Sequence, residues 1–202
     1  MVAVRGSHLL NPQDFVIEQW CAGLKLAEQT EKSLIDAWYY ARDLMSTRPD
    51  EMKNATLMLQ SGVEMVEILH ELNMDAETLL TAMLFPIVAN KLTDWESLKE
   101  KFGAKITKLL KGVLEMDNIR QLNASHSANV LQVDNVRRML LAMVDDFRCV
   151  IIKLAERITF LRDAEHRCAE EDKVLAAKEC SYIYAPLANR LGSGQLKWEL
   201  ED

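Results

Sequence analysis

The stretch "LQSGVEMVEILHEL" at residues 59–72 determines the fold class expected for this chain. Projected at about 100° per residue, its apolar side chains fall nearly all round the helix, the pattern of a helix buried on every side. Those side chains are Leu59, Val63, Met65, Val66, Ile68, Leu69 and Leu72. We therefore expect a central helix here, with the rest of the chain packed around it.

The next apolar stretch, "LLTAMLFPIVANKLTD" at residues 79–94, looks like a second buried helix that contains a proline. Asp75 with Thr78 predicts its start, because an Asp side chain can accept a hydrogen bond from the first free backbone N–H groups. Pro86 removes one helical hydrogen bond and clashes with the preceding turn, which costs about 3 kcal/mol unless the helix bends. We predict a kink or break near Phe85-Pro86, within residues 82–86.

Helical patterns continue on both sides of this pair. Their expected positions are Pro12 through Leu24, Thr30-Glu31 through Leu44, a helix opening at Pro49, one capped by Thr93-Asp94, one after Gly103, one after Asp145-Asp146, and Val174 through Leu187. Residues 117–130 are polar and are expected to form a loop. The run "CVII" at residues 149–152 could form a strand, but a helix is favoured because no pairing partner is evident.

Composition supports a single all-α domain. The chain has 202 residues, of which 49% are hydrophobic and 27% charged, and its 7 Gly and 4 Pro are too few for a strand-and-turn architecture. We assign residues 1–190 to this multi-helix domain and residues 191–202 to the start of a connection to another domain. The last residues lack any helix stop signal, so we expect a truncated chain.

Charge and cysteine usage narrow the classes of function. With a net charge of −7, the chain lacks the excess of Lys and Arg expected of a nucleic-acid-binding protein, so no direct nucleic-acid site is expected. No apolar run is long enough to span a bilayer. The four cysteines form no CxxC pair and no signal peptide precedes them, which indicates a reduced, cytoplasmic protein.

Two groups of polar residues are weighed as candidate sites. Glu67 and His70 have Glu-x-x-His spacing, but one copy without facing carboxylates is more typical of an ordinary core or surface histidine. Basic residues alternate with acidic ones between 137 and 162, which usually indicates solvated faces with ion pairs. A nucleotide-phosphate site in this segment is the alternative.

Three long segments carry a family resemblance. "GVEMVEIL", "VDNVRRMLLAMVDDFRCVIIKLAER" and "YAPLANRLGSGQLKWELED", in this order, resemble the amino-terminal portion of the RelA/SpoT family of (p)ppGpp synthetase/hydrolases, and "MVAVR" at the start is similar to the RelA branch. The resemblance implies a helical HD-type domain. In active members this domain holds manganese with a His, a His-Asp pair and a later Asp, and it removes the 3′-pyrophosphate of (p)ppGpp.

The same resemblance implies that this chain has lost those groups. The first metal His falls on Ser61, the His-Asp pair on Phe85-Pro86, the catalytic Glu-Asp on Ala89-Asn90, and the Asp of "KLADR" on Glu156 in "KLAER". Phe, Pro and Ala have no side-chain lone pair to offer a metal, so only Glu156 remains a credible ligand. A catalytically inactive domain with neither metal nor catalytic residues is expected.

The family also implies what the rest of a longer protein would do. A synthetase domain would transfer pyrophosphate from ATP to GTP or GDP with magnesium, and this domain would regulate it, with the ribosome selecting the active state through the full-length protein. Leu191 through Asp202, with Trp198, is the expected coupling element. Two alternatives stay open: residual hydrolysis using Glu156 and Asn90, and guanine-nucleotide binding by Lys153 or Arg157 without chemistry.

Overall fold

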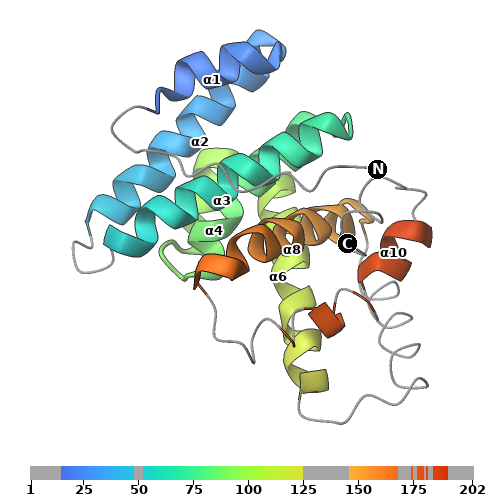
Figure 1. Cartoon of the computed structure of the whole chain (residues 1–202). Helices are drawn as coiled ribbons and strands as arrows, with labels where there is room; N and C mark the ends of the chain where they lie inside the picture. Colours follow the sequence, from blue (N-terminus) through green and yellow to red (C-terminus); the bar gives the residue numbers. More distant parts are fainter. Residues whose placement is uncertain are drawn as a thin grey trace. The chain divides into compact units, whose positions relative to one another are not determined.

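The computed structural model is helical throughout the residues that it describes, which are 15–47, 52–124, 146–167, 174, 177–179, 181 and 184–190. These residues contain no strand (Figure 1). The helices are α1 (Ile17–Leu24), α2 (Glu28–Ser46), α3 (Met52–Glu71), α4 (Ala76–Ala89), α5 (Trp95–Phe102), α6 (Ala104–Ala124), α8 (Arg148–Arg167) and α10 (Ala185–Arg190). The all-α fold class is confirmed.

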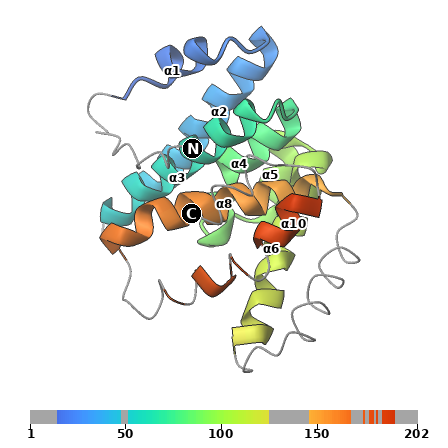
Figure 2. The same cartoon turned by 45° about the vertical axis from the view of Figure 1, so that its right-hand side comes forward.

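The chain divides into two compact units, residues 8–111 and residues 112–202 with 1–7. In the first unit α3 packs mainly against α4, α2 packs against both, and α1 packs against α2 (Figure 2). Part of the second unit is α8, which carries the "KLAER" motif. The expectation of one domain over residues 1–190 stays a prediction.

The two helices expected to be buried form the core of the first unit. On α3, Val63, Met65, Val66 and Leu69 are at most 2% exposed, as the all-round apolar pattern predicts. On α4, every residue from Thr78 to Val88 is buried. Because neither helix has a wide polar face, the other helices of this unit must cover them from several sides.

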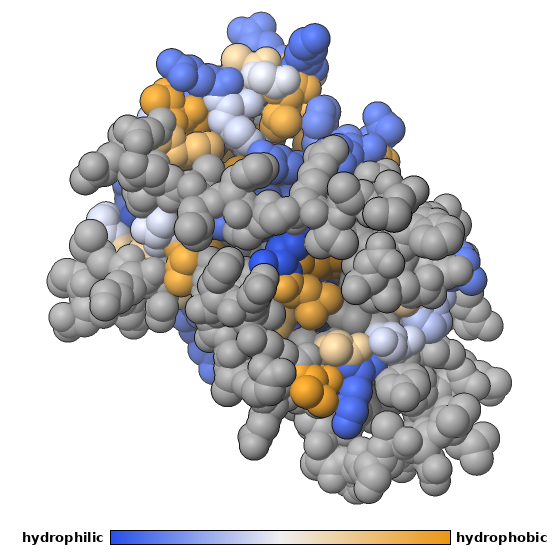
Figure 3. Space-filling view, in the orientation of Figure 1, coloured by the Kyte–Doolittle hydropathy of each residue, from blue (hydrophilic) through white to orange (hydrophobic). Residues whose placement is uncertain are grey.

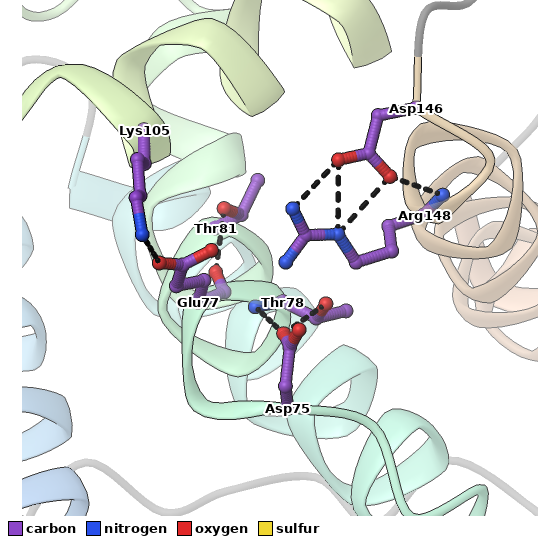
Figure 4. Close-up of polar contacts among 7 residues, drawn as sticks. All are labelled: Asp75, Glu77, Thr78, Thr81, Lys105, Asp146 and Arg148. Atoms are coloured by element: carbon purple, nitrogen blue, oxygen red, sulfur yellow. Dashed lines mark hydrogen bonds and ion pairs between the residues drawn. The ribbon is translucent and has the colours of Figure 1, made fainter.

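Most of the predicted helix starts agree with the structure. The Asp75 carboxylate accepts hydrogen bonds from the backbone N–H and the hydroxyl of Thr78, at 2.9 and 2.6 Å (Figure 4). Asp94 caps α5 in the same way, through the N–H groups of Glu96 and Ser97. Asp146 accepts from the Arg148 N–H at the start of α8. These caps satisfy N–H groups that have no partner inside their helices.

Several predicted boundaries were wrong. Residues 117–124 belong to α6 and not to a loop. Residues 149–152 lie in α8, so the strand alternative is excluded. α2 begins at Glu28, two residues before the predicted signal. The predicted helix starts at Pro12 and Pro49 and the connection 191–202 lie outside the described residues.

The surface of the first unit is mixed in character. In the region of α1, Figure 3 shows mainly hydrophilic residues with small hydrophobic areas between them. Val16, immediately before α1, is one exposed apolar residue, at 43% exposure. None of the helices in the described part of the chain is both long enough and apolar enough to cross a bilayer.

Candidate functional site

One group of candidate positions lies on α3 and α4, which approach each other closely next to Ser61. A Cβ atom placed on Gly62 would lie 3.1 Å from the backbone oxygen of Met83. Such a distance is tighter than nine in ten real Cβ contacts, so a side chain at residue 62 would require α4 to shift by a few tenths of an ångström. Gly62 was not predicted to matter, since sequence alone does not show which helix faces it.

Phe85 and Pro86 lie inside the core of this unit. Phe85 is 3% exposed, and Pro86 is also buried. Neither side chain has a nitrogen or oxygen that could bind a metal ion. The position where the resemblance places a His-Asp pair is thus filled by apolar packing.

The helix does not break at Pro86. α4 runs without interruption from Ala76 to Ala89, so the break predicted at residues 82–86 is wrong. Pro86 lies in the last turn, where only three helical residues follow it, and its missing N–H removes a single bond to the turn before. The expected kink stays a prediction.

Asn90 has a structural role at the end of α4. Its side-chain amide donates to the Pro86 carbonyl oxygen at 2.8 Å, and its backbone N–H donates to the same oxygen at 3.2 Å. Lys91 follows with φ 56°, and the N–H groups of Lys91 and Leu92 bond to Val88 and Ile87, which is a Schellman ending. The residue that replaces the family's catalytic Asp therefore closes the helix.

A separate candidate position, Glu156, lies on α8. Its carboxylate is 2.8 Å from the Lys153 ammonium and accepts a 2.7 Å hydrogen bond from Arg157 Nε, with a further contact from Arg157 Nη2. Arg157 Nη1 also lies 3.8 Å from the Glu179 carboxylate. We call these four residues the α8 ionic cluster.

Three of the four members are buried, contrary to expectation, and the Glu156 side chain is 15% exposed. Lys153 is 0% exposed and Arg157 4%, whereas the alternating charges of this segment predicted solvated faces. All residues from Cys149 to Ala155 are buried, so the charge of Lys153 lies within an apolar stretch of α8. The alternation of charges along the sequence did not predict this burial. Glu179 was also missed, because nothing in the sequence links it to a residue so far away along the chain.

The neighbouring cations keep the Glu156 carboxylate ionised. Burial alone would raise the pKa of Glu156, but the nearby charges of Lys153 and Arg157 outweigh it and lower this pKa to about 2. For Arg157, burial acts to lower the pKa, yet Glu156 holds it above its ordinary value. Glu156 is therefore an anion at neutral pH whose charge is balanced by two fixed cations.

The surroundings of Glu156 disfavour a bound metal ion. A divalent ion would compete with an ammonium and a guanidinium for the same carboxylate, and Ser61, Phe85 and Pro86 stand where the resemblance implies the other ligands. Among the described residues, no group of three or more His, Cys, Asp or Glu side chains comes together. The residues present do not fit a manganese ion.

Glu67 and His70 behave as the simpler interpretation predicted. The Glu67 carboxylate accepts a 2.9 Å hydrogen bond from the Trp20 indole N–H, which links α3 to α1. His70 is in the last turn of α3, where the N–H of Asn73 donates to its backbone oxygen. The pair serves helix packing and helix ending in this structure.

Comparison with known proteins gives the family. An HD domain model matches residues 37–194, which is most of the chain and includes every candidate position described above. The chain therefore belongs to the HD domain family.

The relatives narrow this class further. The chain is 96% identical over 202 residues to the GTP pyrophosphokinase of Haemophilus influenzae, 52% identical over 205 residues to that of Escherichia coli K12, and 46% identical over 204 residues to that of Photobacterium angustum. Each alignment covers 100% of this chain but 27% of the relative. The chain thus corresponds to about a quarter of these proteins and agrees with the resemblance to the amino-terminal HD domain of RelA/SpoT proteins.

Proposed function

We propose that this chain is a catalytically inactive, hydrolase-like regulatory domain of a RelA-type GTP pyrophosphokinase. The observation that carries the proposal is the state of α4, where Phe85 and Pro86 are buried and Asn90 closes the helix. Hydrolysis of a phosphate ester by such a site needs a metal to bring a bound water to a pKa near 7. Without nitrogen and oxygen donors the metal, and with it the nucleophile, is lost.

The parent protein supplies the activity in this proposal. The relatives are named GTP pyrophosphokinases, so a transferase that moves pyrophosphate from ATP to GTP or GDP with magnesium is proposed for the missing part. Regulation would then follow population shift: the domain contacts the synthetase domain differently in its active and inactive arrangements, and the ribosome selects one. A cytoplasmic location belongs to the same proposal.

Two measurements on the full-length protein test this function. Incubation with ppGpp and manganese should release no pyrophosphate above a blank, while synthesis from ATP and GDP proceeds. Replacing Trp198 by Glu in the proposed coupling element should then alter synthesis or its response to ribosomes. Pyrophosphate release that disappears in Glu156→Gln would refute inactivity, and an unchanged response in Trp198→Glu would refute this coupling element.

The two alternatives have less support from the described residues. Residual hydrolysis would need Glu156 and Asn90, but the first is engaged by two cations and the second is bonded to the Pro86 carbonyl. Nucleotide binding by Lys153 or Arg157 would need a phosphate to reach side chains that are at most 4% exposed. Calorimetry with ppGpp, GDP and GTP should therefore show no binding that depends on these two residues.

A further inference from the structure

The α5–α6 region of the first unit concentrates positive charge in an acidic chain. Between residues 91 and 111 there are six lysines and three carboxylates, a net charge of +3 within a chain of net charge −7. All six lysines are exposed. We call them the lysine face: Lys91, Lys99, Lys101, Lys105, Lys108 and Lys111.

Helical spacing gathers half of the lysine face along one side of α6. Lys105, Lys108 and Lys111 recur every three residues on the exposed surface of the first turns of this helix. The positive end of the helix dipole lies in these same turns, where lysine is electrostatically unfavourable and an anion is favoured. One carboxylate, Glu77, is 3.3 Å from Lys105, whose side chain nevertheless remains 83% exposed (Figure 4).

Aromatic rings lie among these lysines. The Lys101 ammonium is 4.4 Å from the centre of the Tyr40 ring, and the Lys111 ammonium is 5.2 Å from that of Trp95. Trp95 opens α5 and Lys101 is in its last turn, so about 9 Å of helix separates them. Each ring lies close to one ammonium group, and this contact limits where that group can lie on the surface.

The negative charges of the same stretch are partly engaged elsewhere. The Asp94 carboxylate accepts hydrogen bonds from the Glu96 and Ser97 N–H groups and from the Ser97 hydroxyl, at 2.8 to 3.0 Å. A carboxylate that caps a helix is partly compensated by the N–H groups it accepts from. Glu96 and Glu100 are the remaining acidic residues of the stretch. Within residues 91–111 the lysines therefore outnumber the carboxylates.

We propose that the lysine face binds the phosphate backbone of RNA without reading its sequence. Protein interfaces are enriched in arginine and depleted of lysine, whereas this face contains six lysines and no arginine. Exposed lysines that contact phosphates supply the sequence-independent part of binding to a nucleic-acid backbone. The large exposed apolar residues in the described part of the chain are Val16, Phe147 and Val174, so this face has no apolar anchor for a membrane surface.

This inference is independent of the inactive hydrolase site and departs from the expectation of no nucleic-acid site. That expectation came from the net charge of the whole chain, which averages a positive stretch with a more acidic remainder. Binding to phosphates releases counterions, so the affinity should be modest and should fall steeply with salt.

The test is the fluorescence anisotropy of a short labelled single-stranded RNA, titrated with the 202-residue chain over a series of KCl concentrations. The variant Lys105→Gln/Lys108→Gln should lower the slope of log affinity against log salt by about 1.4, because each phosphate contact on a single strand contributes about 0.7. The control Lys32→Gln/Lys178→Gln removes two other exposed lysines and should leave the slope unchanged.

Both variants should melt at the wild-type temperature. Such melting would show that a smaller salt dependence of binding is not caused by unfolding. The proposal is overturned if the wild-type chain does not bind RNA at low salt, or if both double variants change the slope equally. Preferential binding of poly-glutamate or of anionic lipid vesicles over RNA would also overturn it, because the partner would then belong to another class.

Discussion

The α3–α4 pair and α8 show two different ways in which a metal-binding position can be occupied by something else. On α4, the apolar Phe85 and Pro86 stand where the family resemblance implies a His-Asp pair, and both lie in the core. On α8, a carboxylate is kept at Glu156, but Lys153 and Arg157 neutralise it. Phe85 and Pro86 have no side-chain atom that could bind a cation, and the Glu156 carboxylate is already paired with two cations.

The comparison shows at which of the two positions the stability of the fold depends on charge. Removing an apolar side chain from α4 loses burial and packing, which respond little to pH. Removing Glu156 would leave two buried cations without their shared anion, which is among the more costly single changes in a protein. The comparison can therefore be tested by asking which helix tolerates which kind of substitution.

The largest effect is expected when donors are restored to α4. Phe85→His/Pro86→Asp places two polar groups where Phe85 is 3% exposed and Pro86 is buried. Loss of the Phe85 packing alone should cost about 3–5 kcal/mol, and an unpaired buried carboxyl adds to it. Urea unfolding measures this loss. Ala89→Glu, which restores a family residue at an exposed position, is the control and should change stability little.

Manganese sharpens the same experiment. Since Ser61, Ala89 and Asn90 still lack the family's groups, the added metal should not restore the stability of Phe85→His/Pro86→Asp. If manganese at modest concentration raised its unfolding midpoint but not that of the wild type, α4 would be a metal site that lacks only two donors. The view that apolar packing has rebuilt this region would then be wrong.

A smaller but still large effect is expected from Glu156→Gln. Breaking a buried ion pair costs about 3–5 kcal/mol, and a neutral amide that still accepts hydrogen bonds should place this change near the lower value. Asp43→Asn removes the exposed partner of Arg42 and should cost at most about 0.5 kcal/mol. Equal losses in the two variants would show that the α8 ionic cluster behaves as a surface pair.

The same variant predicts a change in acid stability. The pKa of Glu156 is lowered from its ordinary value of 4.5 to about 2 in the folded chain. Its contribution is therefore fully present above pH 4.5 and is lost as the pH falls from 4.5 towards 2, where the unfolded state binds a proton first. Unfolding free energy should fall less steeply over this range in Glu156→Gln than in the wild type.

The smallest effect is expected at three glycines that differ in the space around them. Gly112→Ala would place a Cβ 2.6 Å from Cys149 Sγ and should cost about 1–3 kcal/mol, which Cys149→Ala in the same chain should largely recover. Gly62→Ala meets the Met83 backbone at 3.1 Å and should cost less, while Gly23→Ala meets nothing and should stabilise α1 slightly. A Gly112→Ala cost that Cys149→Ala does not reduce would refute the contact.

Local signals in the sequence predicted much of the fold. Asp75 and Asp94 were recognised as caps because their chemistry acts within three residues, and α3 was recognised because its apolar residues surround the helix. Residues 117–124 were misassigned because they lack an apolar stripe, although a helix already formed extends at little cost through such residues. The break at Pro86 was wrong because the local rule counts the lost hydrogen bond and the clash with the preceding turn, but not the burial of α4, which favours a continuous helix.

The candidate site was less predictable than the fold. The positions Ser61, Phe85, Pro86, Ala89, Asn90 and Glu156 came from the family resemblance, and the structure adds what surrounds them. That Lys153 is fully buried, or that Glu179 lies near Arg157, depends on contacts between segments far apart along the chain. Local patterns carry no information on such contacts.

Manganese binding tests the central claim most directly. Electron paramagnetic resonance of free Mn²⁺, titrated with the 202-residue chain at neutral pH, should show no loss of the free-ion signal beyond that given by Glu156→Gln. A stoichiometric loss in the wild-type chain that Glu156→Gln abolishes would contradict the account, because Glu156 would then anchor an ion despite Lys153 and Arg157.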